Sequence, residues 1–82
     1  MELEQLQQSV MNAMTKVAPD LQVETLKKDR DWRDQIDFDS VDYLNFVIAL
    51  NQSLGIEIPE KDYPKLDSFD HAVQYLNEKL KL

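Results

Sequence analysis

The sequence predicts an all-α fold: a small bundle of three main helices plus one short helix, with a long ordered loop between helices 1 and 2. Two observations lead to this class. The 82-residue chain has one glycine and three prolines, too few for the many turns of a β-rich fold. Its apolar residues also recur at spacings of three and four in separate stretches. The length fits a single domain spanning residues 1–82.

The first helical stretch covers residues 2–17. Its apolar residues are Leu3, Leu6, Val10, Met14 and Val17. They share one face of a helix, and Glu and Gln side chains occupy the other. Pro19 ends this helix, because the residue before a proline is disfavoured in the α region.

Residues 19–38 show no clean period, but they are too apolar for a disordered linker. Their apolar residues include Leu21, Val23, Leu26, Trp32 and Ile36. We therefore expect a long ordered loop over the core, with one short turn of helix. A segment of about twenty residues without a main element is unusual in a compact domain and usually has a function.

The capping residues at the two ends of residues 39–54 predict the second helix. Asp39 is a suitable N-cap, and Asp42 stands three residues on, as in a capping box. Gly55 suits the position just after the helix. Pro59 then opens a short segment with a helical turn at 60–65.

The last helix is expected to run to about Leu80. Either Asp67 or Ser68 can cap its first turn. Its inner face carries Phe69, Ala72, Val73 and Leu76.

The second helix carries two apolar stripes, although a helix in a small bundle needs only one. At about 100° per residue the stripes lie on different faces. The first contains Tyr43, Val47, Leu50 and Leu54, with Phe46 at its margin, and should face the core. The second contains Val41, Leu44 and Ile48, bordered by Asn45 and Gln52. The second stripe either packs under the long loop or is exposed for a partner helix or surface.

Composition excludes several classes of function. With 16 acidic and 9 basic residues, the net charge of −7 disfavours nucleic acid and anionic membranes and favours partners with basic surfaces. The absence of cysteine and the single histidine exclude Cys-ligated or multi-His metal sites and a Cys–His nucleophile, so no metal is expected. No apolar run approaches a membrane span, and Met1–Glu4 lacks a basic signal region. We expect a cytoplasmic monomer.

Ser40 occupies the first helical position if Asp39 caps the second helix. Its hydroxyl would then project outward, and an attached phosphate would lie beside free backbone N–H groups. Asp37, Asp39 and Asp42 surround it with negative charge. These features alone also describe an ordinary capping cluster with a solvated serine.

Four segments extend this pattern through most of the chain. They are Asp39-Ser40-Val41-Asp42, Phe46-Val47-Ile48-Ala49-Leu50, Ile56-Glu57-Ile58-Pro59 and Ser68-Phe69-Asp70-His71-Ala72-Val73-Gln74-Tyr75-Leu76. Together they resemble the acyl carrier protein family over nearly the full length. The first segment corresponds to the family's Asp-Ser-Leu-Asp attachment motif.

The resemblance implies a carrier rather than an enzyme, with residues 1–82 as one acyl carrier domain. In the family, the motif serine, here Ser40, receives 4′-phosphopantetheine from coenzyme A through a Mg-dependent phosphopantetheinyl transferase. Asp39 completes the motif and caps the helix. The thiol of the arm holds an acyl group as a thioester, which suits a chain without cysteine. The implied partners are the transferase and acyl-loading and acyl-transferring enzymes with basic docking surfaces.

The resemblance also assigns a docking face and an acyl pocket. The docking face corresponds to Asp37, Val41, Asp42, Leu44, Asn45 and Ile48. The pocket into which an acyl chain can withdraw corresponds to Tyr43, Phe46, Val47, Leu50, Ile58, Leu66 and Ala72. Ordinary core packing would also explain this second set.

Departures from the family pattern indicate a specialised fatty-acid, lipid or polyketide pathway. The usual glycine before the motif is Asp37, and the usual leucine after the serine is Val41. Positions that are often Glu are Asn45, Asn51 and Gln52. Two alternatives stay open: an aminoacyl or peptidyl carrier, whose Gly-Gly-x-Ser style motif is absent, and an acidic helical interaction module with Ser40 unmodified.

Overall fold

The computed structural model describes residues 2–22 and 25–80 of the chain. Its main elements are α1 (Leu3–Val17), α2 (Ser40–Leu54) and α3 (Phe69–Leu80). Two short 3-10 helices, η2 (Trp32–Asp34) and η3 (Glu60–Leu66), lie between them. These described ranges contain no strand, only an isolated bridge between Asp31 and Ser68. The predicted all-α bundle, its short helix and its long ordered loop are confirmed.

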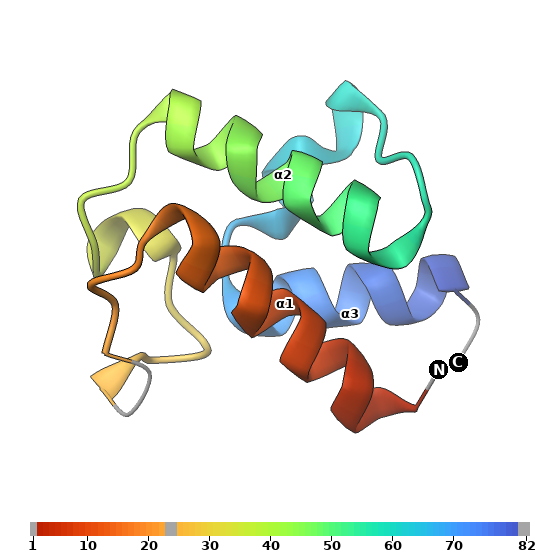
Figure 1. The fold of residues 1–82 in the computed structure, drawn as a ribbon, viewed down its shortest axis with the longest axis horizontal. Helices are drawn as coiled ribbons and strands as arrows, with labels where there is room; N and C mark the ends of the chain where they lie inside the picture. The colour runs from red at the N-terminus through yellow and green to blue at the C-terminus, as the bar shows by residue number, and fades with distance from the viewer. Residues whose placement is uncertain (1, 23–24, 81–82) are drawn as a thin grey trace.

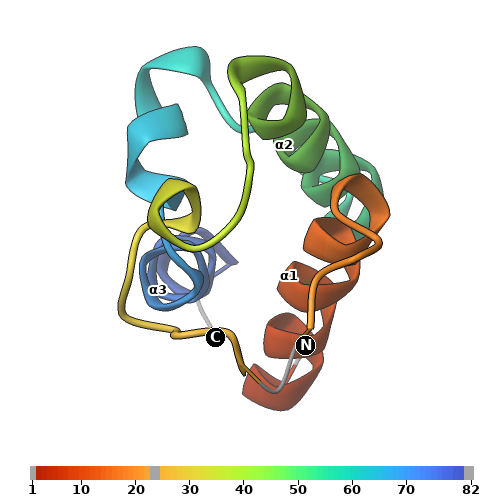
Figure 2. The ribbon, with the colours of Figure 1, turned by 90° about the vertical axis from the view of Figure 1, so that its left-hand side faces the viewer.

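The three main helices surround one core. Figure 1 shows α2 above α1 and α3, and η3 behind the right-hand part of α2. Figure 2 views the same bundle from the end where α2 begins, and the long loop crosses this end. The loop and the first turn of α2 therefore share one end of the molecule.

The predicted caps of α2 are confirmed. The carboxylate Oδ1 of Asp39 accepts a hydrogen bond of 2.8 Å from the backbone N–H of Asp42. In return, Oδ2 of Asp42 accepts a longer bond of 3.4 Å from the N–H of Asp39. At the other end Gly55 has a φ of 64°, a left-handed conformation that favours glycine. Local sequence therefore sets both ends of this helix.

Ser68 caps α3, which resolves one of the alternatives left open by the sequence. Its hydroxyl oxygen accepts a hydrogen bond of 3.1 Å from the N–H of His71. The Asp67 carboxylate instead lies 2.6 Å from Nδ1 of His71. Both candidates contribute to the start of α3, but only Ser68 caps the backbone.

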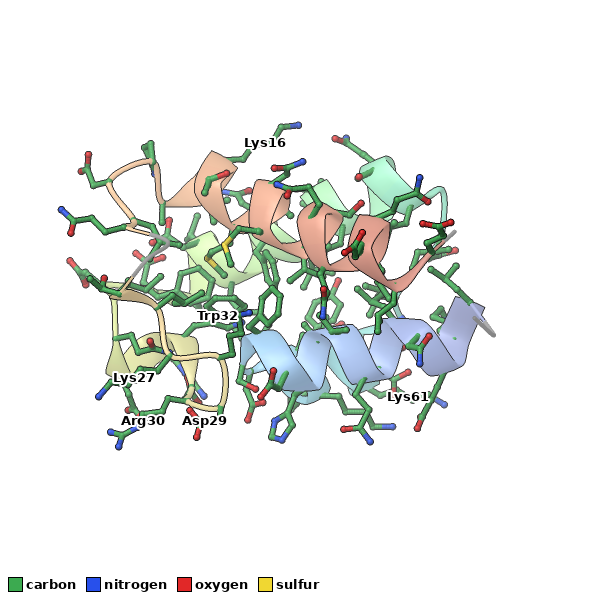
Figure 3. All side chains as sticks on the ribbon, turned by 90° about the horizontal axis from the view of Figure 1, so that it is seen from below. Lys16, Lys27, Asp29, Arg30, Trp32 and Lys61 are labelled. Carbon is green, nitrogen blue, oxygen red and sulfur yellow. The ribbon has the colours of Figure 1, made fainter. Side chains whose placement is uncertain are left out.

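The long loop is tied to the rest of the bundle through Trp32. Its side chain is fully buried, and its indole N–H donates a 2.9 Å hydrogen bond to the carbonyl of Leu66. Its backbone N–H donates to the carbonyl of Asp67, and the N–H of Asp70 donates to the carbonyl of Lys28. Figure 3 shows Trp32 pointing into the interior, whereas the labelled Lys27 and Arg30 point away from it. Val23, another predicted loop residue, lies outside the described residues.

The core-facing stripe of α2 differs from the prediction. Phe46, expected at the margin, is fully buried, whereas Tyr43 and Leu54 are only partly buried. The loop explains this, because Trp32 packs edge-on against Phe46 with ring centroids 5.6 Å apart. Phe38 approaches the same ring at 6.4 Å. The position of the loop thus rotates the buried face of α2 toward Phe46.

Candidate attachment site and docking face

Ser40 is exposed at the first position of α2, as the sequence predicts. Asp39, its neighbour, adopts an extended backbone and caps the helix through Asp42. The first N–H groups of a helix have no partner inside the helix and can bind a phosphate oxygen. Here the Asp42 N–H is already bonded to the Asp39 carboxylate, so this role would fall to the N–H groups before it. An exposed hydroxyl beside such groups is suited to carrying a group that is linked through a phosphate.

Three acidic side chains lie around this serine. Asp37 and Asp39 are exposed and Asp42 is partly buried. One arginine of the loop, Arg33, pairs with Asp31, because its guanidinium lies 3.2 Å from the Asp31 carboxylate. The hydrogen bond from Arg33 lowers the pKa of Asp31. Arg33 is therefore bonded to Asp31, and the acidic surface stays next to Ser40.

The second apolar stripe of α2 is exposed. The exposed fractions are 62% for Val41, 45% for Leu44 and 41% for Ile48. The loop does not cover them, because its Trp32 and Phe38 pack on the opposite side of α2, against Phe46. Of the two interpretations left open by the sequence, the structure supports exposure. We refer to Val41, Leu44 and Ile48 as the exposed strip.

A surface hollow of about 410 Å³ adjoins the exposed strip between the end of α1 and α2. It is lined by Lys16, Val17, Asp42, Asn45, Ile48, Ala49 and Gln52. Three predicted docking residues, Asp42, Asn45 and Ile48, thus border one depression. Lys16, which Figure 3 shows on the outside of α1, was not assigned from the sequence because it is distant from the motif.

The predicted acyl-pocket residues are brought together, but as packed core. Six of them are buried: Phe46, Val47, Leu50, Ile58, Leu66 and Ala72. Tyr43 packs against this cluster from a partly buried position. Their contacts are those of an ordinary core, so the pocket role stays a prediction.

Curated relatives identify the family. The acyl carrier protein of Chloroherpeton thalassium is 31% identical over 58 residues, which cover 71% of this chain and 72% of that protein. The chain belongs to the acyl carrier protein family. The acyl carrier protein of Lactobacillus johnsonii is 35% identical over 51 residues, and the chain spans 64% of its length. That of Renibacterium salmoninarum is 27% identical over 67 residues, or 82% of this chain and 78% of that protein. No family model matches the chain.

Membership of the acyl carrier protein family makes this protein a carrier rather than an enzyme.

Within residues 2–22 and 25–80, no group of three or more His, Cys, Asp or Glu side chains is placed to hold a metal ion. No helix in that part of the chain is long and apolar enough to cross a membrane.

Phe38 is a residue near the site that the sequence reasoning did not assign. It is buried, and its ring centroid lies 5.7 Å from that of Tyr43. Phe38 precedes the N-cap and Tyr43 is the fourth residue of α2, which is the spacing of a hydrophobic staple. This staple is the sequence signal that could have revealed the contact.

Proposed function

We propose that residues 1–82 form one acyl carrier domain that holds acyl groups as thioesters on a 4′-phosphopantetheine arm attached to Ser40. One observation supports this above all: in a chain of this family, Ser40 is exposed at the first position of α2, directly after the Asp39 cap. The arm would be linked to Oγ of Ser40 through its phosphate. When bound, it supplies the thiol that this cysteine-free chain lacks.

The arrangement of charge supports partner enzymes with basic docking surfaces, including the phosphopantetheinyl transferase. Asp37, Asp39 and Asp42 lie next to the attachment serine, where they would attract a basic surface. The exposed strip would supply the apolar contacts that hold a complex together. Each partner would thus meet charge at the start of α2 and apolar groups along it.

The same surface supports dedicated partners in a specialised fatty-acid, lipid or polyketide pathway. Residues 43–54 contain no charged side chain, and Asn45 and Gln52 are exposed amides. A partner that relies on basic residues along the whole helix would find no carboxylates there. A partner with a neutral, partly apolar surface fits this stretch better.

Modification of Ser40 is tested by intact mass. The protein is incubated with coenzyme A, Mg²⁺ and a broad-specificity phosphopantetheinyl transferase. We expect the mass of one phosphopantetheine to be added, and Ser40→Ala to abolish the addition. Ser53→Ala is the matched control, because Ser53 is an exposed serine on the same helix. An unchanged mass for the unaltered protein, or a label on Ser53 or Ser68, would contradict the proposal.

A further inference from the structure

Aromatic rings fill the core at the end of the bundle where α2 begins. Trp32 and Phe46 are fully buried, and Phe38 is 6% exposed. Tyr43 completes the group, with its ring centroid 5.7 Å from Phe38 and 6.5 Å from Phe46. The four rings pack against one another in one continuous aromatic cluster.

Tyr43 follows Ser40 by three residues in α2 and packs against the core. Its side chain and that of Ser40 are therefore neighbours on the helix surface. Its ring is partly buried, and its hydroxyl donates a hydrogen bond to the carbonyl of Tyr63 in η3. Burial raises the pKa of Tyr43 to about 12. The ring is fixed to α2 at its base and, by the hydrogen bond to Tyr63, to η3 at its tip.

Phe38 packs against the Tyr43 ring from the side of the loop. Phe38 immediately precedes Asp39 in the chain, so the capped start of α2 positions Phe38. Val47, Leu50 and Leu66 are fully buried in the same core cluster, which includes Phe38 and against which Tyr43 packs. These three belong to the predicted acyl pocket, and Tyr43 is the member of that predicted set that stands nearest to Ser40 along α2.

We propose that Tyr43, held by Phe38 and the Tyr63 carbonyl, is the specificity-determining residue for the acyl cargo and closes the route from Ser40 into the core. This inference rests on the proposed attachment at Ser40. A long saturated chain kept outside the core exposes its methylenes to water, and each one costs free energy. Short or polar acyl groups avoid that cost. They are therefore the cargo class that this closed end favours.

The experiment uses octanoyl-coenzyme A as the donor for the transferase, so that the protein is loaded with octanoyl-phosphopantetheine. The unaltered protein is compared with Tyr43→Phe, which loses only the hydroxyl, and Tyr43→Ala, which loses the ring. Tyr75→Phe is the matched control. Its hydroxyl also donates a hydrogen bond, of 2.7 Å to Asp62, but it links α3 to η3.

Two readouts report where the chain lies: the methyl NMR shifts of Val47 and Leu50, and the rate at which hydroxylamine cleaves the thioester. In Tyr43→Phe the ratio of inserted to exposed chain should rise about fivefold, the effect of losing one ordinary hydrogen bond. Tyr43→Ala should protect the thioester further, and Tyr75→Phe should match the unaltered protein. An unfolded variant would be cleaved faster, so loss of folding cannot imitate this result.

The outcomes separate the two proposals. If the octanoyl chain already contacts Val47 and Leu50 in the unaltered protein, and all four proteins are cleaved at equal rates, Tyr43 does not control entry. The carrier function would stand in that case, because the mass would still show loading. Absence of any mass gain would overturn the attachment at Ser40 and the inference with it.

Discussion

The two sides of α2 are similar in composition and opposite in environment. Val47 is fully buried, whereas Ile48, the next residue, is 41% exposed. Both are β-branched aliphatic residues, so hydrophobicity alone does not separate them. Phe46 and Val47 face the core, and Phe46 also packs against Trp32 of the loop, whereas the exposed strip lies on the other side of the helix. Neighbouring elements, rather than apolar content, therefore decide which side of this helix is core and which can meet a partner.

Stability measurements should separate the two sides most strongly. Phe46→Ala should lower the free energy of unfolding by about 3–5 kcal/mol, because it removes a fully buried ring and leaves a cavity. Ile48→Ala should change it by less than about 0.5 kcal/mol, as expected for a surface position. Urea unfolding followed by circular dichroism measures both. Equal losses would show that the exposed strip is packed in solution.

Acyl transfer by partner enzymes should depend on the exposed side of α2 instead. Ile48→Glu should leave folding intact but weaken acyl transfer by the protein's own partner about tenfold through faster dissociation, because it places a charge on an apolar anchor. Asn45→Glu should leave that transfer nearly unchanged and improve use by a generic ketosynthase with a basic docking patch. Transfer kinetics of both variants measure this. If the unaltered protein already serves that ketosynthase as well as a housekeeping carrier does, the proposal of a dedicated partner is wrong.

High pH should weaken the packing of two partly buried tyrosines, Tyr43 on the inner side of α2 and Tyr75 on α3. Burial raises the pKa of Tyr43, and likewise that of Tyr75, to about 12, from an ordinary value of 10.0. The unfolded chain therefore loses these protons first. The tyrosine contribution to stability should be complete below about pH 10 and be lost as the pH rises toward 12. Urea unfolding across this range should show a shallower decline for Tyr43→Phe; an identical decline would mean that Tyr43 is not buried in solution.

Salt should produce the smallest effect, at the start of α2. Asp37, Asp39 and Asp42 repel one another beside Ser40, but exposed like charges cost only fractions of a kcal/mol. The melting temperature should rise modestly with ionic strength or millimolar Mg²⁺, as screening reduces the repulsion. Asp37→Asn should blunt this response more than it changes stability. A melting temperature independent of salt would show that the three carboxylates are already neutralised.

The sequence by itself determined the features that depend on short-range chemistry. Asp39 and Asp42 cap α2 because their side chains reach backbone N–H groups three residues away. Gly55 ends the helix because its φ of 64° is unfavourable for other residues. The position of Ser40 at the first turn follows from these local contacts. The attachment motif and both ends of its helix could therefore be predicted without knowledge of the rest of the chain.

Only the tertiary structure decided which apolar residues of α2 are buried and what Tyr43 contacts. The loop places Trp32 against Phe46 and ties its indole to Leu66, a contact between residues 34 positions apart. Helical periodicity could assign Phe46 only to the margin of a stripe, because periodicity contains no information about where a loop packs. For the same reason Tyr43 could be placed on the inner face, but its bond to Tyr63 could not be foreseen. Contacts between distant segments depend on how all the elements pack together, and that arrangement sets both the exposed strip and the closed aromatic end.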